Sequence, residues 1–170
     1  MDLDFDDDAF VRAPPRLVYR RLVDPSSYPE WWPGFRLVRA APTAATFDAE
    51  AVAAGDELDQ LMGAPTEPGE AHLAFHLRRG GLRRRIAVVA RPYRFRPLKG
   101  FAAALDGDVV GTIEWWLEAG WGGTVVHHLA HLAPHRRRAR IGYRRSARAA
   151  LFGLKDAVQT EVRELAGLEP

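Results

Sequence analysis

Residues 109–133, VVGTIEWWLEAGWGGTVVHHLAHLA, hold the pattern that decides the fold. Two segments of strand length, 109–118 and 123–133, flank a glycine-rich turn at Gly120 to Gly123. Side chains of a strand alternate between the two faces of a sheet, and a short glycine-rich connection is typical of antiparallel neighbours. The stretch therefore predicts a β-hairpin.

Three further segments of strand length precede this hairpin, at 71–79, 82–91 and 98–106. Each boundary carries turn residues, namely Gly80-Gly81, the proline-containing stretch 92–97, and Asp106-Gly107-Asp108. Five consecutive strands joined by tight turns form an antiparallel meander.

After Pro134 the apolar period changes from two residues to three or four. This period predicts one long amphipathic helix of about 30 residues at the C-terminal end. Its predicted apolar face consists of Ile141, Ala147, Ala150, Leu151, Leu154, Val158, Val162 and Leu165.

The N-terminal part predicts a strand and two short helices. Apolar residues alternate with charged ones over 3–12, and Pro14-Pro15 suits the first turn of a helix over 14–23. Asp24 is a good N-cap for a second short helix that ends before Pro33-Gly34. A strand is expected at 35–41.

Residues 42–69 differ in composition from the rest of the chain, because Ala, Thr, Asp, Glu, Gly and Pro dominate them. We interpret this segment as an insertion that contains one helix near 48–62. With 170 residues, 47% of them hydrophobic, the chain is expected to form a single domain over 1–170.

Composition excludes several classes of protein. The absence of cysteine removes disulfides, thiolate nucleophiles and cysteine-ligated metals. No stretch approaches the ~18 apolar residues of a membrane span, and the acidic start does not resemble a secretory signal. We therefore expect a cytoplasmic protein without a transmembrane segment.

The charges are uneven, although the formal net charge is only +2. Basic residues crowd one late segment, and a solvated surface or a weak contact with an anionic surface would both explain them. No specific nucleic-acid partner is expected. The residues concerned are Arg136, Arg137, Arg138 and Arg140, followed by Arg144, Arg145 and Arg148.

Several short sequence motifs, in their order along the chain, resemble those of the START-like, or SRPBCC, superfamily. Ala13-Pro14-Pro15 resembles the opening of its first helix, and residues 28–34, YPEWWPG, are similar to a phrase in its second. Asp106-Gly107-Asp108, with Trp115 and Gly123-Thr124 further on, resembles its last strands. The polyketide cyclase/dehydrase branch is the most similar. The resemblance implies an α+β helix-grip fold, in which a seven-stranded curved antiparallel sheet follows two short helices after strand 1 and grips a long C-terminal helix.

Histidines are the first candidates for chemistry. His72 with His76, and His127 with His131, are four residues apart, but in strands this spacing separates them by roughly 13 Å. Neither pair can chelate one ion alone, so no metal and no cofactor are predicted.

Strand alternation separates the neighbouring pairs Trp115-Trp116 and His127-His128. We expect Trp115 and His128 to face the interior, and Trp116 and His127 to face outward. His128 is either a core histidine with a satisfied hydrogen bond or, with Tyr143, a proton-transfer group. An apolar outer face that includes Trp116 would favour a homodimer through the sheet.

A cavity between sheet and helix is the predicted ligand site, and aromatic filling of that space is the alternative. Its expected residues are Trp32, Phe75, Ile86, Val88, Phe101, Ala103, Ile113, Trp115, Val126, His128, Tyr143, Arg144, Ala147 and Leu151. Leu73 and Leu105 would complete the apolar wall. Arg144 would bind a ligand carboxylate or phosphate, or simply lie on a solvated helix face.

Two functions fit this pattern. The first is noncatalytic binding or transport of a hydrophobic small molecule, such as a lipid, isoprenoid or polyketide-like compound. The second is an enzyme of the polyketide cyclase or aromatase type, with His128 and Tyr143 as candidate catalytic residues. The sequence contains no nucleophile elbow, phosphate-binding loop or dinucleotide fingerprint, which disfavours hydrolase, kinase and Rossmann functions.

Overall fold

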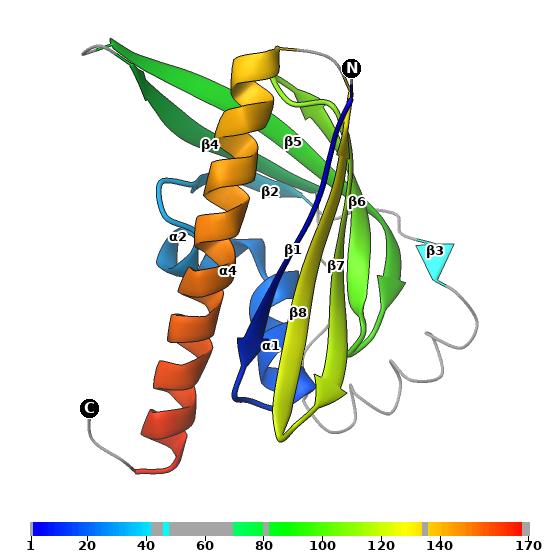
Figure 1. Cartoon of the computed structure of the whole chain (residues 1–170), viewed down its shortest axis with the longest axis vertical. Coiled ribbons are helices and arrows are strands. Elements are labelled where there is room, and N and C mark those ends of the chain that lie inside the picture. The colour runs from blue at the N-terminus through cyan, green and yellow to red at the C-terminus, as the bar shows by residue number, and fades with distance from the viewer. Residues whose placement is uncertain (1, 42–45, 48–69, 80–81, 134–135, 168–170) are drawn as a thin grey trace.

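The computed structural model describes residues 2–41, 46–47, 70–79, 82–133 and 136–167. Within these residues, one sheet bends around a long helix, α4 (Arg137–Leu165), as Figure 1 shows. The strands follow the order β1-β8-β7-β6-β5-β4-β2, and every neighbouring pair is antiparallel. Their bounds are β1 Leu3–Val11, β2 Arg36–Ala41, β4 Glu70–Arg79, β5 Leu82–Arg96, β6 Gly100–Gly107, β7 Gly111–Gly120 and β8 Gly123–Leu132.

The α+β class, the antiparallel sheet and the long C-terminal helix are confirmed, but the count of seven strands is not. The two-residue strand β3 (Thr46–Phe47) adds an eighth and pairs parallel with β5. The helix predicted near 48–62 lies outside the described residues, as does most of the predicted insertion 42–69.

Strand β5 is longer than predicted, because it continues through Pro92 to Arg96. Proline cannot donate to a sheet ladder, and strands tolerate it at bulges. The register between β5 and β6 shifts between Pro92 and Arg94, which is such a bulge. The proline that predicted a turn therefore marks an irregular ladder.

The two short helical segments after β1 lie as predicted. Helix α1 (Pro15–Val23) begins at the expected proline, and the 3₁₀ helix η1 (Pro25–Ser27) continues into α2 (Tyr28–Trp31). The Asp24 carboxylate accepts a hydrogen bond from the Ser26 N–H at 2.9 Å, so it is the predicted cap. Both α1 and α2 contact α4.

Helix α4 buries one face against β1, β8, α1 and α2. That face differs from the predicted one at two positions, since Ile141 and Leu165 are 39% and 71% exposed. Ile141 lies two residues before the buried Tyr143, and two residues turn a helix by about 200°. The observed buried side chains include Ala139, Tyr143, Ala147, Ala150, Leu151, Leu154 and Val158.

Candidate functional site

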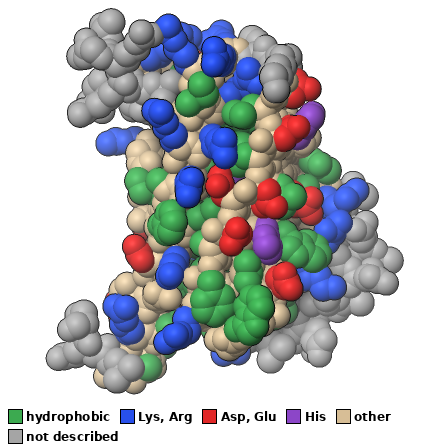
Figure 2. Space-filling view, viewed as in Figure 1, with side chains coloured by type: hydrophobic (Ala, Val, Ile, Leu, Met, Phe, Trp, Pro, Cys, Tyr) green, Lys and Arg blue, Asp and Glu red, His purple; other side chains and the backbone are tan. Residues whose placement is uncertain are grey.

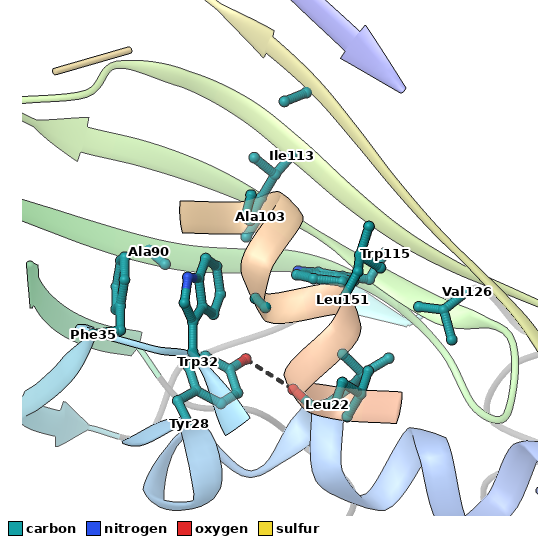
Figure 3. Packing of buried hydrophobic residues seen from close by; sticks show 14 of the residues in the cluster. Leu22, Tyr28, Trp32, Phe35, Ala90, Ala103, Ile113, Trp115, Val126 and Leu151 are labelled. Carbon is teal, nitrogen blue, oxygen red and sulfur yellow. Dashed lines mark hydrogen bonds between the residues drawn. The ribbon is translucent and has the colours of Figure 1, made fainter. Parts of the chain in front are cut away.

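The space between the sheet, α2 and α4 is almost filled. The cavity measures about 20 Å³, which is room for about one water molecule. Aromatic rings occupy the rest: Trp32 lies 5.7 Å from Trp31 and 5.9 Å from Trp115, centroid to centroid. The aromatic alternative is therefore the correct one for this structure, and Figure 3 shows Trp32 and Trp115 side by side in the packed interior.

Six of the residues predicted for the ligand site line this cavity. They are Trp32, Val88, Phe101, Ile113, Trp115 and Tyr143, and the predicted Leu73 and Leu105 line it too. The others are buried in the core around it: Phe75, Ile86, Ala103, Val126, His128, Ala147 and Leu151. Only Arg144 among the predicted residues is exposed.

Five lining residues were missed by sequence reasoning: Pro25, Tyr28, Ala71, Ala90 and Pro92. For Ala71 and Ala90 a signal existed, since strand alternation continues from Leu73 and Val88 to each of them. Pro25 belongs to η1 and Tyr28 to α2, and the packing of both segments depends on contacts distant in sequence. Pro92 was assigned to a turn.

His128 is fully buried and lies behind the cavity wall. Its ring stacks on Trp115 at 4.1 Å and meets Phe5 edge-on at 5.6 Å. Nδ1 lies 3.5 Å from the carbonyl oxygen of Glu114, and Nε2 lies 3.3 Å from the hydroxyl oxygen of Tyr143. The alternative of a core histidine with satisfied hydrogen bonds matches this geometry.

Burial sets the protonation of both residues. It lowers the pKa of His128 to about 4, against the smaller raising effect of the Glu114 carbonyl. Burial also raises the pKa of Tyr143 far above its usual value, and the nearby Tyr28 adds to this rise. Both side chains are therefore neutral near pH 7.

Helix α2 is held against the site by contacts of its side chains and backbone. The Trp32 indole N–H donates to the Ser146 hydroxyl of α4 at 2.8 Å, and the Trp31 indole N–H donates to Ser27 at 3.0 Å. Gly153 of α4 lies so close to Trp31 that an added Cβ would overlap the carbonyl oxygen of Trp31. The absence of a side chain at Gly153 thus permits the close approach of α2 to α4.

An ionic cluster lies beside these contacts. Arg21 of α1 donates to Glu161 of α4 at 3.0 Å and to Glu30 of α2 at 2.5 Å, and Arg20 also pairs with Glu161. The Glu161 side chain is only 12% exposed, whereas that of Glu30 is 62% exposed. Arg21 consequently links α1, α2 and α4.

The arginines of the late segment do not form one surface. Figure 2 shows basic side chains along α4, next to acidic side chains and histidines over the neighbouring strands. Arg144 places its guanidinium over the Phe5 ring at 5.5 Å, away from the cavity, in agreement with the solvated-face alternative. Arg136 pairs with Asp108, and Arg140 is only 8% exposed, so the inclusion of Arg140 in a contact surface was wrong.

The outer face of the sheet carries the residues predicted there. Trp116 is half-buried beneath the Arg96 guanidinium, 5.2 Å from the ring centroid, and His127 is also half-buried. Leu129 and Tyr93 are 39% and 45% exposed. Charged side chains share this face with the apolar ones, since Asp4 of β1 pairs with His131 of β8.

Neither a metal cluster nor a membrane-spanning helix is found among the described residues. Over the residues that the structure describes, no group of three or more His, Asp or Glu side chains is arranged to hold a metal ion. No helix of the described chain is both long and apolar enough to cross a membrane.

Comparisons with known proteins agree with this architecture. No protein-family model and no curated protein matches the sequence. Among solved structures, protein Ms6760 from Mycobacterium smegmatis matches with a TM-score of 0.63 and 11% identity, covering 94% of this chain and 92% of its own. Ara h 8.0201 matches with a TM-score of 0.59 and 11% identity, covering 94% and 99%.

A third similar structure is the ZhuI aromatase/cyclase from Streptomyces sp. R1128. It matches with a TM-score of 0.56 and 13% identity over 96% of this chain and 97% of that one. At these identities the likeness concerns the fold. Together with the strand order and the gripped helix, it shows that this chain has the helix-grip fold.

Proposed function

We propose that this protein binds a hydrophobic small molecule, such as a lipid, isoprenoid or polyketide-like compound, between its sheet and α4 as a noncatalytic carrier or sensor. The observation that carries the proposal is the composition of the cavity wall. Every residue that lines the cavity is apolar or aromatic, and none is charged. Small side chains, Ala71 and Ala90, lie among the large ones. Such a wall suits a ligand held by burial of apolar surface.

Binding on this proposal requires the cavity to enlarge, because about 20 Å³ admits no organic ligand. The two walls differ in how they are held. Ladders of backbone hydrogen bonds hold the wall formed by β4 to β7. The α2 wall depends instead on a few side-chain contacts, such as Trp32 with Ser146. We therefore expect Trp32 and Tyr28 to move aside when a ligand enters.

The cyclase alternative receives less support from the geometry. A general acid or base works best with a pKa near the operating pH and within reach of the substrate. His128 does not line the cavity, and its pKa of about 4 leaves it neutral at pH 7. Tyr143 lines the cavity but keeps its proton, since burial raises its pKa.

The test begins with protein purified without delipidation. Mass spectrometry of an organic extract should reveal a lipophilic compound at a stoichiometric fraction of the protein. Addition of a matching ligand to stripped protein should raise the melting temperature and change the tryptophan fluorescence, because Trp32 and Trp115 line the site. If no lipophile co-purifies, and no member of a lipid and polyketide panel shifts the melting temperature, the proposal fails.

A matched pair of variants locates the site. Ala90→Leu adds bulk to the cavity wall, whereas Ala87→Leu adds the same bulk on the exposed face of the same strand. Binding should be lost in the first variant and kept in the second.

A homodimer through the outer sheet face is proposed separately. Its support is the exposed Leu129 and Tyr93 beside the half-buried Trp116. Light scattering at high protein concentration should give twice the mass of the chain, and a clean monomer mass would exclude this dimer.

A further inference from the structure

The exposed face of α4 combines two kinds of side chain. Over residues 137–155 of this helix, every exposed side chain is an arginine or a large apolar group, and the segment contains no aspartate or glutamate. Figure 2 shows the basic side chains that follow the helix. We call the seven exposed residues the α4 stripe: Arg137, Arg138, Ile141, Arg144, Arg145, Arg148 and Phe152.

The α4 stripe follows one side of the helix. Each residue turns an α-helix by about 100°, so the directions of Ile141 and Phe152 differ by only about 20°. By the same rule, the five arginines lie within about 60° of Ile141, some on each side of it. Arg137 and Phe152 are roughly 22 Å apart along the axis. A flat partner laid along α4 would therefore meet both apolar side chains and the arginines beside them.

The arginines of the α4 stripe are not neutralised within the described part of the protein. Other arginines meet carboxylates, as Arg21 does with Glu161 and Arg136 with Asp108. Among the described residues, none of the five stripe guanidinium groups pairs with a carboxylate, and Arg144 contacts an aromatic ring instead. Although the late arginines as a whole do not share one surface, these five do, and their charge is available to an external anion.

This charge does not stabilise the helix that carries it. Arg137 and Arg138 lie in the first turn, where the helix dipole favours anions over cations, and no acidic residue lies in that turn. Arg144 and Arg148 are four residues apart, a spacing at which like charges on a helix repel each other. An anionic partner would relieve both effects.

The apolar residues of the α4 stripe distinguish between two anionic partners. A nucleic acid would pair its phosphates with the arginines and would leave Ile141 and Phe152 in water. A membrane surface accommodates both kinds of side chain, because acyl chains lie directly beneath the lipid phosphates. Ile141 is 39% exposed and Phe152 is 54% exposed, so both side chains have apolar surface to bury in a partner.

We propose that α4 docks this protein on anionic lipid membranes, with the five stripe arginines at the lipid phosphates and Ile141 and Phe152 at the acyl chains. The opposite face of α4 stays in the core, so docking requires no unfolding of the helix. This inference goes beyond the proposed function and does not depend on it, because no residue of the α4 stripe lines the cavity.

The experiment measures co-sedimentation of the full chain with large unilamellar vesicles. One set contains phosphatidylcholine alone, and the other contains phosphatidylcholine with an equal amount of phosphatidylglycerol, which has an anionic headgroup and matched acyl chains. The protein should bind the anionic vesicles at low salt and lose that binding as the salt concentration rises. Equal binding to both kinds of vesicle would overturn the proposal, since acyl chains alone would then account for it.

A matched pair of double variants tests the arginines. Arg145→Gln with Arg148→Gln should lower the partition coefficient for anionic vesicles about 25-fold, at about fivefold for each charge near the surface. Arg94→Gln with Lys99→Gln removes the same charge from exposed positions in β5 and in the turn that follows it. These two residues lie outside the α4 stripe, so binding should stay nearly unchanged. Equal losses in the two double variants would show that only the net charge matters and would overturn docking through α4.

Phe152→Gln tests the apolar contact separately. It should lower binding to anionic vesicles about tenfold, because an apolar side chain no longer enters the membrane. The dependence on salt should stay that of the wild type, since no charge changes. Unchanged binding of this variant would show that Phe152 does not enter the membrane and would overturn the proposed contact.

A labelled DNA duplex serves as the competing anionic partner, and its binding is followed by fluorescence anisotropy. Binding to the duplex without binding to anionic vesicles would assign the α4 stripe to nucleic acid and overturn the membrane proposal. Binding to neither partner would overturn it as well. A ligand found or not found in the cavity affects none of these outcomes, so this inference and the proposed function fail independently.

Discussion

Gly153 provides the sharpest test of how α2 packs on α4. A Cβ at this position would overlap the Trp31 carbonyl oxygen and lie 2.9 Å from the Trp31 carbonyl carbon. Both obstructing atoms are backbone, so no side-chain rotation can relieve the conflict. Gly153→Ala must move α2 away from α4.

Two effects of opposite sign determine the magnitude. Alanine stabilises a helix relative to glycine by about 0.8–1.0 kcal/mol. Overpacking a well-packed contact costs about 1–3 kcal/mol, and a conflict with backbone belongs in the upper half of that range. The net result is a loss of about 1–2 kcal/mol in the free energy of unfolding, or a melting temperature lower by roughly 2–8 °C.

The assay is urea denaturation, together with near-ultraviolet circular dichroism of the tryptophans. Thr160→Ala is the control, because Thr160 lies exposed on the same helix and its replacement should slightly raise stability. Displacement of α2 should also weaken the dichroic signal, since Trp31 stacks on Trp32. If Gly153→Ala is about 1 kcal/mol more stable than wild type with an unchanged tryptophan signal, the close contact does not exist.

Three further predictions concern protonation, the ionic cluster and a hairpin. The pKa of His128 falls from 6.5 in the unfolded chain to about 4 in the folded one, so the unfolded state binds more protons between these values. The contribution of His128 to stability should be complete above pH 6.5 and should decline by roughly 3 kcal/mol towards pH 4. In urea titrations at a series of pH values, His128→Phe should remove that decline. An equally steep decline in the variant would contradict the assignment to His128. Glu161→Gln should lower the free energy of unfolding by about 1–3 kcal/mol, because the 12% exposed carboxylate accepts from Arg20 and Arg21. Glu30→Gln should lower it by less than about 1 kcal/mol, because that side chain is 62% exposed. Equal losses of the two variants in denaturant titrations would refute this ranking. Trp121 is 88% exposed and has a φ of 49° in the turn between β7 and β8. Because asparagine tolerates a positive φ better than tryptophan, Trp121→Asn should raise stability by up to about 1 kcal/mol in thermal unfolding. A loss of stability would show that the indole contributes a contact.

Much of the fold followed from local patterns. Alternation in β7 and β8 correctly placed Trp115 and His128 inside and Trp116 and His127 outside, because a strand has a fixed period of two. The same rule predicted six strand residues of the cavity wall, namely Leu73, Val88, Phe101, Leu105, Ile113 and Trp115. A local pattern suffices wherever the backbone geometry alone fixes the direction of a side chain.

The errors arose where packing between distant elements overrides local preference. Pro92 predicts a turn by itself, but the bulge against β6 admits it into a strand. Ile141 continues the apolar pattern of the sequence, yet the helix face that meets the sheet includes Tyr143 and leaves Ile141 exposed. The run of arginines predicts that Arg140 lies on the surface, although its side chain is buried. Whether the interior is open or filled depends on the volumes of side chains from η1, α2, α4 and strands β4 to β7, and no single segment encodes it.

The filled interior also sets the scale of the ligand. Displacement of one buried aromatic side chain such as Trp32 costs about 3 kcal/mol, so the binding-competent state is populated at roughly 1 in 150 and affinities fall by that factor. A micromolar ligand must supply about 8 kcal/mol beyond this cost, a total of about 11 kcal/mol. At about 25 cal/mol per Å² this corresponds to roughly 450 Å² of buried apolar surface, before the ligand's own loss of freedom. Small hydrocarbons should therefore bind only weakly, and tight binding should require a skeleton longer or broader than a twelve-carbon chain.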